Sequence, residues 1–390
     1  MKYRVNFINS NYRRFYQAHK REVDSAVQNC LAKGELTLRK DLWDLEKSIA
    51  DYVGTKYAAG VGSGTDALFL SLKALGIGPG DEVVTVSNTF IATIQAIVHC
   101  GASPLLVDVN EDEQMDPEEL ERAITKKTKA IVPVHYTGAM CDMREILRIA
   151  RKHKIHVVED ACQALGAEQG GKRAGSFGIT GCLSFNNAKL LGGLCDGGMV
   201  VTNDRKLYER ICLLRNHWNV HQLSVDRNDY PQPKRMEWAW KSRLSNVNAA
   251  FLNVKFKYLD WMIKRRSEIA NRYTNEFCCK ENIISDLTRK KRYLVPHDDF
   301  VQERIWQEYH FRALKDRGKL ADFLKKNGIE TLTRDTVPNH KMRGLGLGGF
   351  SLPVTESLAK EVIRLPLHEW LTDKEVEWII GAVKRFYAKR

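Results

Sequence analysis

Residues 57–107 read YAAGVGSGTDALFLSLKALGIGPGDEVVTVSNTFIATIQAIVHCGASPLLV. Three short runs of mainly alanine, valine and leucine alternate in this stretch with two segments whose apolar residues recur at helical spacing. Strand, helix and strand in this order are typical of parallel strands joined by crossover helices. The stretch therefore predicts an α/β fold with a mainly parallel sheet that is covered by helices on both faces.

The same alternation continues to about residue 204. The predicted strands are Tyr57–Val61, Glu82–Val86, Ser103–Val107, Ala130–His135, His156–Glu159, Gly181–Phe185 and Met199–Thr202. The predicted helices between them are Asp66–Leu75, Ile91–His99, Pro117–Ala123 and Met143–His153. The pattern then changes to two long helices, over 207–218 and 247–277. A strand at 309–314 and helices at 320–326 and 373–386 follow these two helices. We predict a three-layer αβα large domain over residues 1–255, and a connector helix with a smaller C-terminal α/β domain over 256–390.

The composition describes an ordinary globular chain of 390 residues, 43% of them hydrophobic and 28% charged. No apolar run approaches the roughly 18 residues that a membrane span needs, and the basic N-terminus has no secretory signal pattern. The nine cysteines are scattered and form no C-x-x-C pair, which favours free thiols over disulfides or a zinc site. We therefore expect a cytoplasmic protein with no metal and no membrane contact.

The chain is basic, with 61 Lys and Arg against 48 Asp and Glu and a net charge of +13. The basic residues are interleaved with acidic ones and form no tail, so nucleic acid is not the expected partner. An excess of positive charge attracts anionic metabolites. A phosphorylated small substrate is therefore the simpler expectation.

Lys189 stands in unusual surroundings. It is the only charged residue from Ala174 to Cys195, in AGSFGITGCLSFNNAKLLGGLC. Most lysines are solvated, but a solvated loop would carry other charges, and this one joins a strand of buried type to a glycine-rich return. An amine in apolar surroundings loses its proton more readily, as a lysine that forms a Schiff base requires.

Two further features fall at the predicted carboxyl edge of the sheet. Asp160 ends the apolar run KIHVVED, where it is either a catalytic carboxylate or a cap of the following segment. Gly62–Asp66 lie between a strand and a helix, where small residues and free amides favour a phosphate, although an everyday helix cap has the same composition. The sequence has no Walker A motif and no dinucleotide fingerprint.

A lysine, a carboxylate and a phosphate cradle on one sheet edge match the needs of pyridoxal phosphate. The lysine joins the cofactor's aldehyde, the carboxylate keeps the pyridine nitrogen protonated, and the amides hold the phosphate. Phe90, which follows the strand EVVTV, would stack on the ring, with core packing as the alternative.

The order of motifs in the chain resembles a known family. SGTDAL, NTFIAT, VPVHYTG, VEDACQALGA, SFNNAKLLG, CDGGMVVTND, KSRLSNVNAAFL and LPLHEWLT together resemble the DegT/DnrJ/EryC1/StrS family of sugar aminotransferases. This family belongs to the aspartate-aminotransferase-like group of pyridoxal phosphate enzymes, of fold type I. The resemblance runs from about residue 25 to the C-terminus, and it implies a homodimer with active sites at the subunit interface.

The resemblance also implies roles for single residues. The cofactor contacts would be Gly64, Thr65, Phe90, Asp160, Gln163, Ser184 and Lys189. Lys189 would be the Schiff-base lysine and proton shuttle, Asp160 the partner of the pyridinium nitrogen, and Gln163 a neighbour of the phenolic oxygen. Backbone amides of Gly64 and Thr65 and the hydroxyl of Ser184 would bind the phosphate.

Some positions depart from the family pattern. Lys241 stands where Asn commonly contacts the phosphate across the dimer interface, and it would do so from the partner subunit. His217 and Arg243 are the expected substrate contacts, and the segment Asn216–Trp240 would shape the mouth of the pocket. Sugar 3-dehydrases of the same family have His in place of Lys189, so the lysine argues against that chemistry.

The expected function is transfer of an amino group from glutamate to a keto-sugar, through pyridoxamine phosphate. The expected acceptor is a 3- or 4-keto-deoxysugar carried on a nucleotide diphosphate, which the excess positive charge would suit. Two alternatives stay open: an inosose or another cyclic ketone as acceptor, and a regulatory protein that binds the cofactor without turnover.

Overall fold

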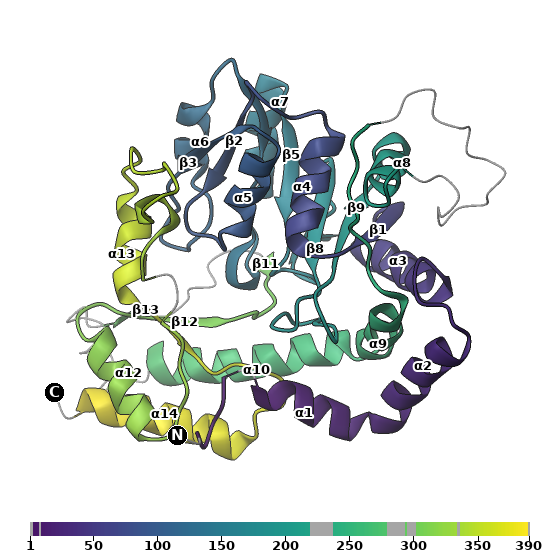
Figure 1. Ribbon diagram of the computed structural model, residues 1–390. Coiled ribbons are helices and arrows are strands. Elements are labelled where there is room, and N and C mark those ends of the chain that lie inside the picture. The colour runs from purple at the N-terminus through teal and green to yellow at the C-terminus, as the bar shows by residue number, and fades with distance from the viewer. Residues whose placement is uncertain are drawn as a thin grey trace.

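A seven-stranded sheet forms the centre of the larger part of the molecule (Figure 1). The computed structural model describes residues 3–7, 9–218, 237–278, 293–294, 302–333 and 336–388, so most of Asn216–Trp240 lies outside these ranges. The strand order is β1 (Tyr57–Val61), β9 (Gly198–Thr202), β8 (Thr180–Ser184), β5 (His156–Asp160), β4 (Thr128–Ile131), β2 (Glu82–Val86) and β3 (Ser103–Val107). Only β9 runs antiparallel to its neighbours, which confirms the predicted mainly parallel sheet.

Both faces of this sheet are buried, as its continuous apolar strands require. The helices on one face are α4 (Gly64–Ala74), α5 (Ala92–His99) and α8 (Arg205–Leu214). The helices on the other face are α3 (Lys40–Val53), α6 (Pro117–Ala123) and α7 (Met143–His153). Neighbouring side chains of β5 lie on opposite faces of the sheet, so Val157 packs in one core and Val158 in the other. The sheet and its helices form the predicted three-layer αβα arrangement.

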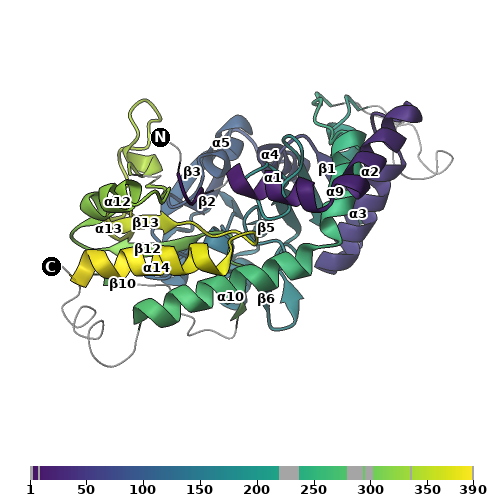
Figure 2. The same cartoon turned by 90° about the horizontal axis from the view of Figure 1, so that it is seen from below.

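A second, smaller core lies around a three-stranded sheet. The strands are β10 (Tyr293–Leu294), β12 (Tyr309–Ala313) and β13 (Val362–Leu365), and the helices near them are α12 (Arg317–Lys326), α13 (Pro353–Glu361) and α14 (Asp373–Ala388). Residues of α10 (Leu259–Cys278) join this core, and α10 and α14 run side by side (Figure 2). A C-terminal α/β unit is thus present, while the domain boundary at residues 255 and 256 stays a prediction.

Short elements and N-terminal helices complete the fold. The remaining elements are α1 (Asn9–Ala18), α2 (Lys20–Ala32), β6 (Glu168–Gln169), β7 (Lys172–Arg173), β11 (Gln302–Glu303) and the 3-10 turns η1 (Tyr136–Gly138) and η3 (Asn339–Lys341). Neither α1 nor α2 was predicted. Phe15 of α1 and Val23 of α2 pack on α9 (Asn246–Phe256). None of the described helices combines the length and the apolarity that a bilayer crossing requires.

The structure corrects three predicted elements. The strand predicted at Ala130–His135 ends at Ile131, because Pro133 has no N–H to donate to a sheet ladder. The helix predicted over 207–218 ends at Leu214, and His217 and Trp218 have positive φ angles that a helix does not allow. The helix predicted over 247–277 is two helices, α9 and α10. Both helices contribute to the large core, α10 through Leu259 and Met262, and only the later part of α10 packs in the small core.

The carboxylate of Glu159, in β5, organises the turn that leads into β8. It is fully buried and accepts hydrogen bonds from the backbone N–H groups of Gly175 (2.8 Å), Phe177 (2.7 Å) and Gly178 (2.6 Å). Nε2 of His135 lies 3.0 Å from the same carboxylate, and Nδ1 of that ring accepts from the N–H of Cys141. One acidic side chain therefore accepts the backbone hydrogen bonds of a loop that has no regular structure.

We expect Glu159→Ala to lower the free energy of unfolding by about 4 kcal/mol, because it leaves several buried donors without an acceptor. The control is Glu118→Ala, whose side chain is 89% exposed and whose expected effect is within about 0.5 kcal/mol. Guanidinium unfolding of both variants beside the unmodified protein measures the difference. Equal midpoints for the two variants would contradict this account of the turn.

Candidate functional site

A cavity of about 920 Å³ lies at the carboxyl edge of the parallel strands, where α/β folds place their ligands. The predicted cofactor residues that line it are Gly64, Thr65, Phe90, Asp160, Gln163, Ser184 and Lys189. They meet because β5 and β8 end there, at Asp160 and Ser184, and because α4 begins there, at Gly64. The structure thus brings all seven together, while the role of each stays a prediction.

Asp160 is held in one orientation by neutral donors. Thr93 Oγ1 donates to its Oδ2 (2.7 Å), and the N–H of Cys162 donates to its Oδ1 (3.2 Å). The carboxylate is buried, and within the described ranges no Lys or Arg side chain forms an ion pair with it. A buried carboxylate needs a cationic partner, and the protonated ring nitrogen of pyridoxal phosphate supplies one.

The N-terminus of α4 lies unusually close to β8. A Cβ on Gly64 would come within 2.8 Å of the Ser184 Cβ and 2.9 Å of the Cys162 Sγ. Ser63 caps the helix by accepting from the N–H of Asp66 (3.1 Å). Free amides at a helix N-terminus beside a serine hydroxyl form an anion site, and this one fits the phosphate of the expected cofactor.

Gln307 clamps the backbone on both sides of Lys189. Its Nε2 donates to the carbonyl oxygen of Ala188 (2.9 Å), and its Oε1 accepts from the N–H of Leu190 (3.0 Å). Gln307 lies just before β12, far from Lys189 in the sequence. The sequence did not indicate Gln307 as a site residue, because no local pattern around a glutamine predicts such a contact.

The glycine-rich return of the Lys189 loop is held by a half-buried tyrosine and a buried lysine. Tyr12 of α1 donates its hydroxyl hydrogen to the carbonyl oxygen of Gly193 (2.6 Å), and Lys255 Nζ of α9 donates to that of Gly192 (3.2 Å). Burial lowers the pKa of Lys255 to about 8, although the negative charge of Glu369 opposes that shift. Sequence analysis predicted neither contact. Tyr12 also lines the cavity.

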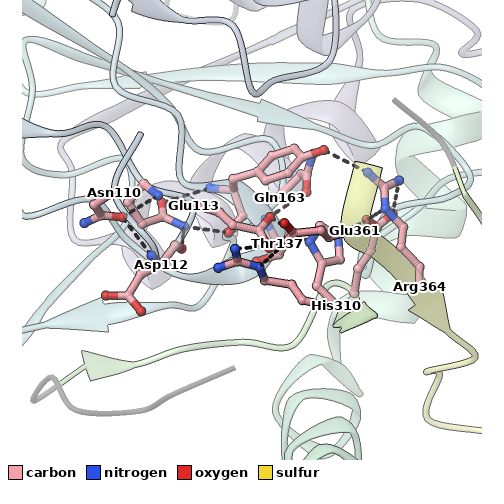
Figure 3. A network of polar contacts seen from close by, with 12 residues as sticks. Asn110, Asp112, Glu113, Thr137, Gln163, His310, Glu361 and Arg364 are labelled. Carbon is pink, nitrogen blue, oxygen red and sulfur yellow. Dashed lines mark hydrogen bonds and ion pairs between the residues drawn. The ribbon is translucent and has the colours of Figure 1, made fainter. Parts of the chain in front are cut away.

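Gln163 points a defined end of its amide into the cavity. Its Oε1 accepts from the N–H of Thr137 (3.0 Å), which lies in η1 with a φ of +58°. Because a backbone N–H only donates, the oxygen of the amide is fixed and its NH₂ group is left to face a ligand. Figure 3 shows Gln163 and Thr137 in the polar network beside His310 and Arg364. This orientation fits a donor to the phenolic oxygen of the cofactor.

An ion pair that the sequence did not indicate lies in the same cavity. Glu308 and Arg364 both line it, with 3.0 Å between Arg364 Nε and Glu308 Oε2. Arg364 Nη2 also donates to the hydroxyl of Tyr136 (2.8 Å). The negative charge in the cavity is therefore not confined to Asp160.

Three predicted residues do not line the cavity of their own chain. His217 and Lys241 are exposed, and Arg243 Nη1 lies 3.4 Å from Asn216 Oδ1. Lys241 pairs with Asn216 in an antiparallel bridge. Their expected contacts, with a substrate and with the cofactor of a partner subunit, stay predictions. Within the described ranges no group of His, Cys, Asp and Glu is arranged to hold a metal ion.

Comparison with known proteins gives consistent relatives. The model of the DegT/DnrJ/EryC1/StrS aminotransferase family matches residues 17–384. A dTDP-3-amino-3,6-dideoxy-alpha-D-galactopyranose transaminase of Aneurinibacillus thermoaerophilus is 36% identical over 96% of this chain and 98% of its own. A UDP-2-acetamido-2-deoxy-3-oxo-D-glucuronate aminotransferase of Pseudomonas aeruginosa is 32% identical (93% and 96%), and a "pleiotropic regulatory protein" of Geobacillus stearothermophilus is 35% identical (95% and 96%).

Solved structures share the fold. The crystal structure of DesV from S. venezuelae superposes with a TM-score of 0.88 and 35% identity over 99% of both chains. That of NtdA from Bacillus subtilis, with bound cofactor PMP (pyridoxamine phosphate), superposes with a TM-score of 0.84 and 27% identity, over 95% of this chain and 82% of the other.

We expect Gly64→Ala to weaken binding of pyridoxal phosphate about 10- to 100-fold, because the added methyl group displaces the start of α4 from Ser184. Gly318→Ala is the matched control, since a Cβ there meets nothing within 4 Å in the first turn of α12. Titration of each apoprotein with the cofactor gives the dissociation constants. An affinity of Gly64→Ala equal to that of the control would show that α4 does not bind the phosphate.

The buried Lys255 makes stability depend on pH. Its folded pKa of about 8 lies below its ordinary value of 10.5, so between these values the unfolded chain binds more protons. We expect the free energy of unfolding to rise by about 2 kcal/mol from pH 8 to pH 10 relative to Lys255→Met. Urea unfolding of both proteins at pH 8, 9 and 10 measures the difference, and parallel curves would show that the amine titrates normally.

Proposed function

The chain belongs to the DegT/DnrJ/EryC1/StrS aminotransferase family, and on that premise we propose that it aminates a keto-sugar carried on a nucleoside diphosphate. It is a pyridoxal phosphate-dependent aminotransferase, as its family membership indicates. The observation that carries the proposal is the meeting of Lys189, Asp160 and the start of α4 in one cavity. The relatives named for dTDP- and UDP-linked sugars support the substrate class.

When bound, pyridoxal phosphate supplies a conjugated ring that accepts an electron pair from the carbon losing a proton. Asp160 would bind and orient the ring nitrogen and stabilise its proton. Lys189 would hold the cofactor through Nζ, and the same amine would move a proton to and from the reacting carbon. Gln307 keeps the backbone of this lysine in place through Ala188 and Leu190.

Glutamate as amino donor, a homodimer and a cytoplasmic location complete the proposal. A shared site is supported by apolar side chains that one subunit leaves exposed, Phe90 of the cavity lining at 63% and Leu194 at 48% exposure, which a second subunit would cover. Lys241, His217 and Arg243 would then act on the partner's cofactor and substrate. The cysteines whose side chains are described are free, which supports a reducing compartment.

Incubation with glutamate and a panel of nucleotide-linked keto-sugars tests this function. We expect 2-oxoglutarate to form and one keto-sugar to gain an amino group, identified by mass spectrometry and NMR. Keto-inositols without a nucleotide serve as the competing acceptors. Amination of these alone would contradict the substrate class, and failure to consume glutamate would favour the regulatory interpretation that the Geobacillus relative's name suggests.

We expect Lys189→Ala to fold normally but to transaminate at least about 100-fold more slowly, because it removes the amine that holds the cofactor and moves the proton. Borohydride treatment of the holoprotein should fix the cofactor's mass on the peptide that carries Lys189. The control is Lys206→Ala, an exposed lysine at the start of α8, which should retain both the label and the rate. Labelling of another peptide, or an active Lys189→Ala variant, would show that the lysine is misassigned.

A further inference from the structure

The carboxylate of Glu308 is fixed at the wall of the cavity by two cationic side chains. Arg364 approaches it through Nε (3.0 Å from Oε2) and Nη1 (3.4 Å from Oε1). Nε2 of His310 lies 3.3 Å from Oε2, and Nδ1 of the same ring lies 2.7 Å from Glu113. Figure 3 shows Glu113, His310 and Arg364 in this network. The network connects the loop between β3 and α6, which carries Glu113, to β12 and β13 of the three-stranded sheet.

These contacts keep Glu308 ionised. Burial alone would raise the pKa of its carboxyl group, but the charges of Arg364, His310 and Lys189 outweigh burial and lower that pKa to about 2. Burial would likewise lower the pKa of His310, and the carboxylates of Glu113 and Glu308 raise it instead. Glu308 and Lys189 line the same cavity, so this carboxylate is available to a ligand bound there.

Glu308 also retains capacity to accept a hydrogen bond. A carboxylate has about four acceptor positions, and among the described residues three contacts are made to it, two of them at Oε2. The longest of these, from Arg364 Nη1, is the one at Oε1. A ligand hydroxyl that enters the cavity can therefore donate to Oε1 without displacing either cation.

The pair is not needed merely to hold the small unit together. An arginine of β12, Arg312, binds Glu361 of α13 (2.8 Å) and Glu111, which follows β3, outside the cavity. This neighbouring cluster already links the residues around the two sheets. A charged pair that instead faces the cavity costs desolvation whenever a ligand binds, which favours a role in recognising that ligand.

We infer that Glu308 is a specificity-determining residue that accepts a hydrogen bond from a ring hydroxyl of the keto-sugar, and that the sugar ring is therefore uncharged. The inference rests on the proposed function and narrows its substrate class. A hydroxyl beside the keto carbon donates to the carboxylate. A uronate would carry its own carboxylate on the same ring, close to the fixed negative charge of Glu308, so it is disfavoured.

The test separates the two half-reactions of the enzyme. Glu308→Gln keeps the shape of the side chain and removes its charge, so we expect the dissociation constant for the keto-sugar to rise about 10- to 100-fold, as for a lost hydrogen bond to a charged group. The glutamate half-reaction, followed alone in single-turnover absorbance, should change less than about threefold. Glu361→Gln, which alters an arginine pair outside the cavity, is the matched control and should leave both half-reactions unchanged.

The unmodified holoenzyme gives an independent arm that needs no variant. With a dTDP-linked 3-keto-6-deoxyhexose and a UDP-linked 3-keto-glucuronate as probes, we expect kcat/KM to favour the neutral sugar at least about tenfold. In Glu308→Gln, the ratio of kcat/KM for the neutral sugar to kcat/KM for the uronate should be smaller. Equal use of the two sugars, or equal loss in both half-reactions of Glu308→Gln, would overturn the inference. Failure to aminate any nucleotide keto-sugar would instead overturn the proposed function, so the two failures are distinguishable.

Discussion

Parallel pairing of β5 with β8 is the constraint on which the site depends. Asp160 lies opposite Cys182 in this register, so the last residues of both strands reach the same edge of the sheet. The N-terminus of α4 is pressed against that edge because Gly64 has no side chain, and Lys189 follows within one short loop of β8. A one-residue slip would turn Asp160 away from the cavity and into a core, since strand side chains alternate between faces.

The sheet was largely predictable because both of its faces are buried. Strands such as Tyr57–Val61 and Glu82–Val86 are then continuous apolar runs between turn residues, and their bounds follow from the sequence. The N-terminal helices were not predictable in this way. Phe15 and Val23 are buried by residues more than two hundred positions away, among them Phe251 and Val254. The break between α9 and α10 was missed for a related reason, since helical spacing continues across it and both helices contribute to the large core.

The same distinction between local sequence patterns and long-range packing applies to the residues of the site. Lys189 and Asp160 were found because each is unusual in its local company, an isolated cation and an acid that ends an apolar strand. No local sequence pattern singles out Gln307, Glu308 and Arg364. Their contacts form only in the folded chain, where the residues around β12 and β13 pack against the Lys189 loop. Tyr12 arrives from the opposite end of the chain. Residues expected to contact the cofactor can thus be identified in the sequence, whereas those proposed to position the lysine or to face the substrate depend on tertiary contacts.

The positive net charge of the chain does not extend to the residues that line its cavity. The net +13 suggested attraction of a phosphorylated substrate. Yet among the described residues that line the cavity, the cations are Lys189 and Arg364 and the anions are Asp160, Asp196 and Glu308. Arg364 is already paired, so the amides of α4 remain for one phosphate and no cation is left for a diphosphate. A nucleoside diphosphate must find its positive partners outside this lining, which is where the expected substrate contacts His217 and Arg243 of a second subunit would be required.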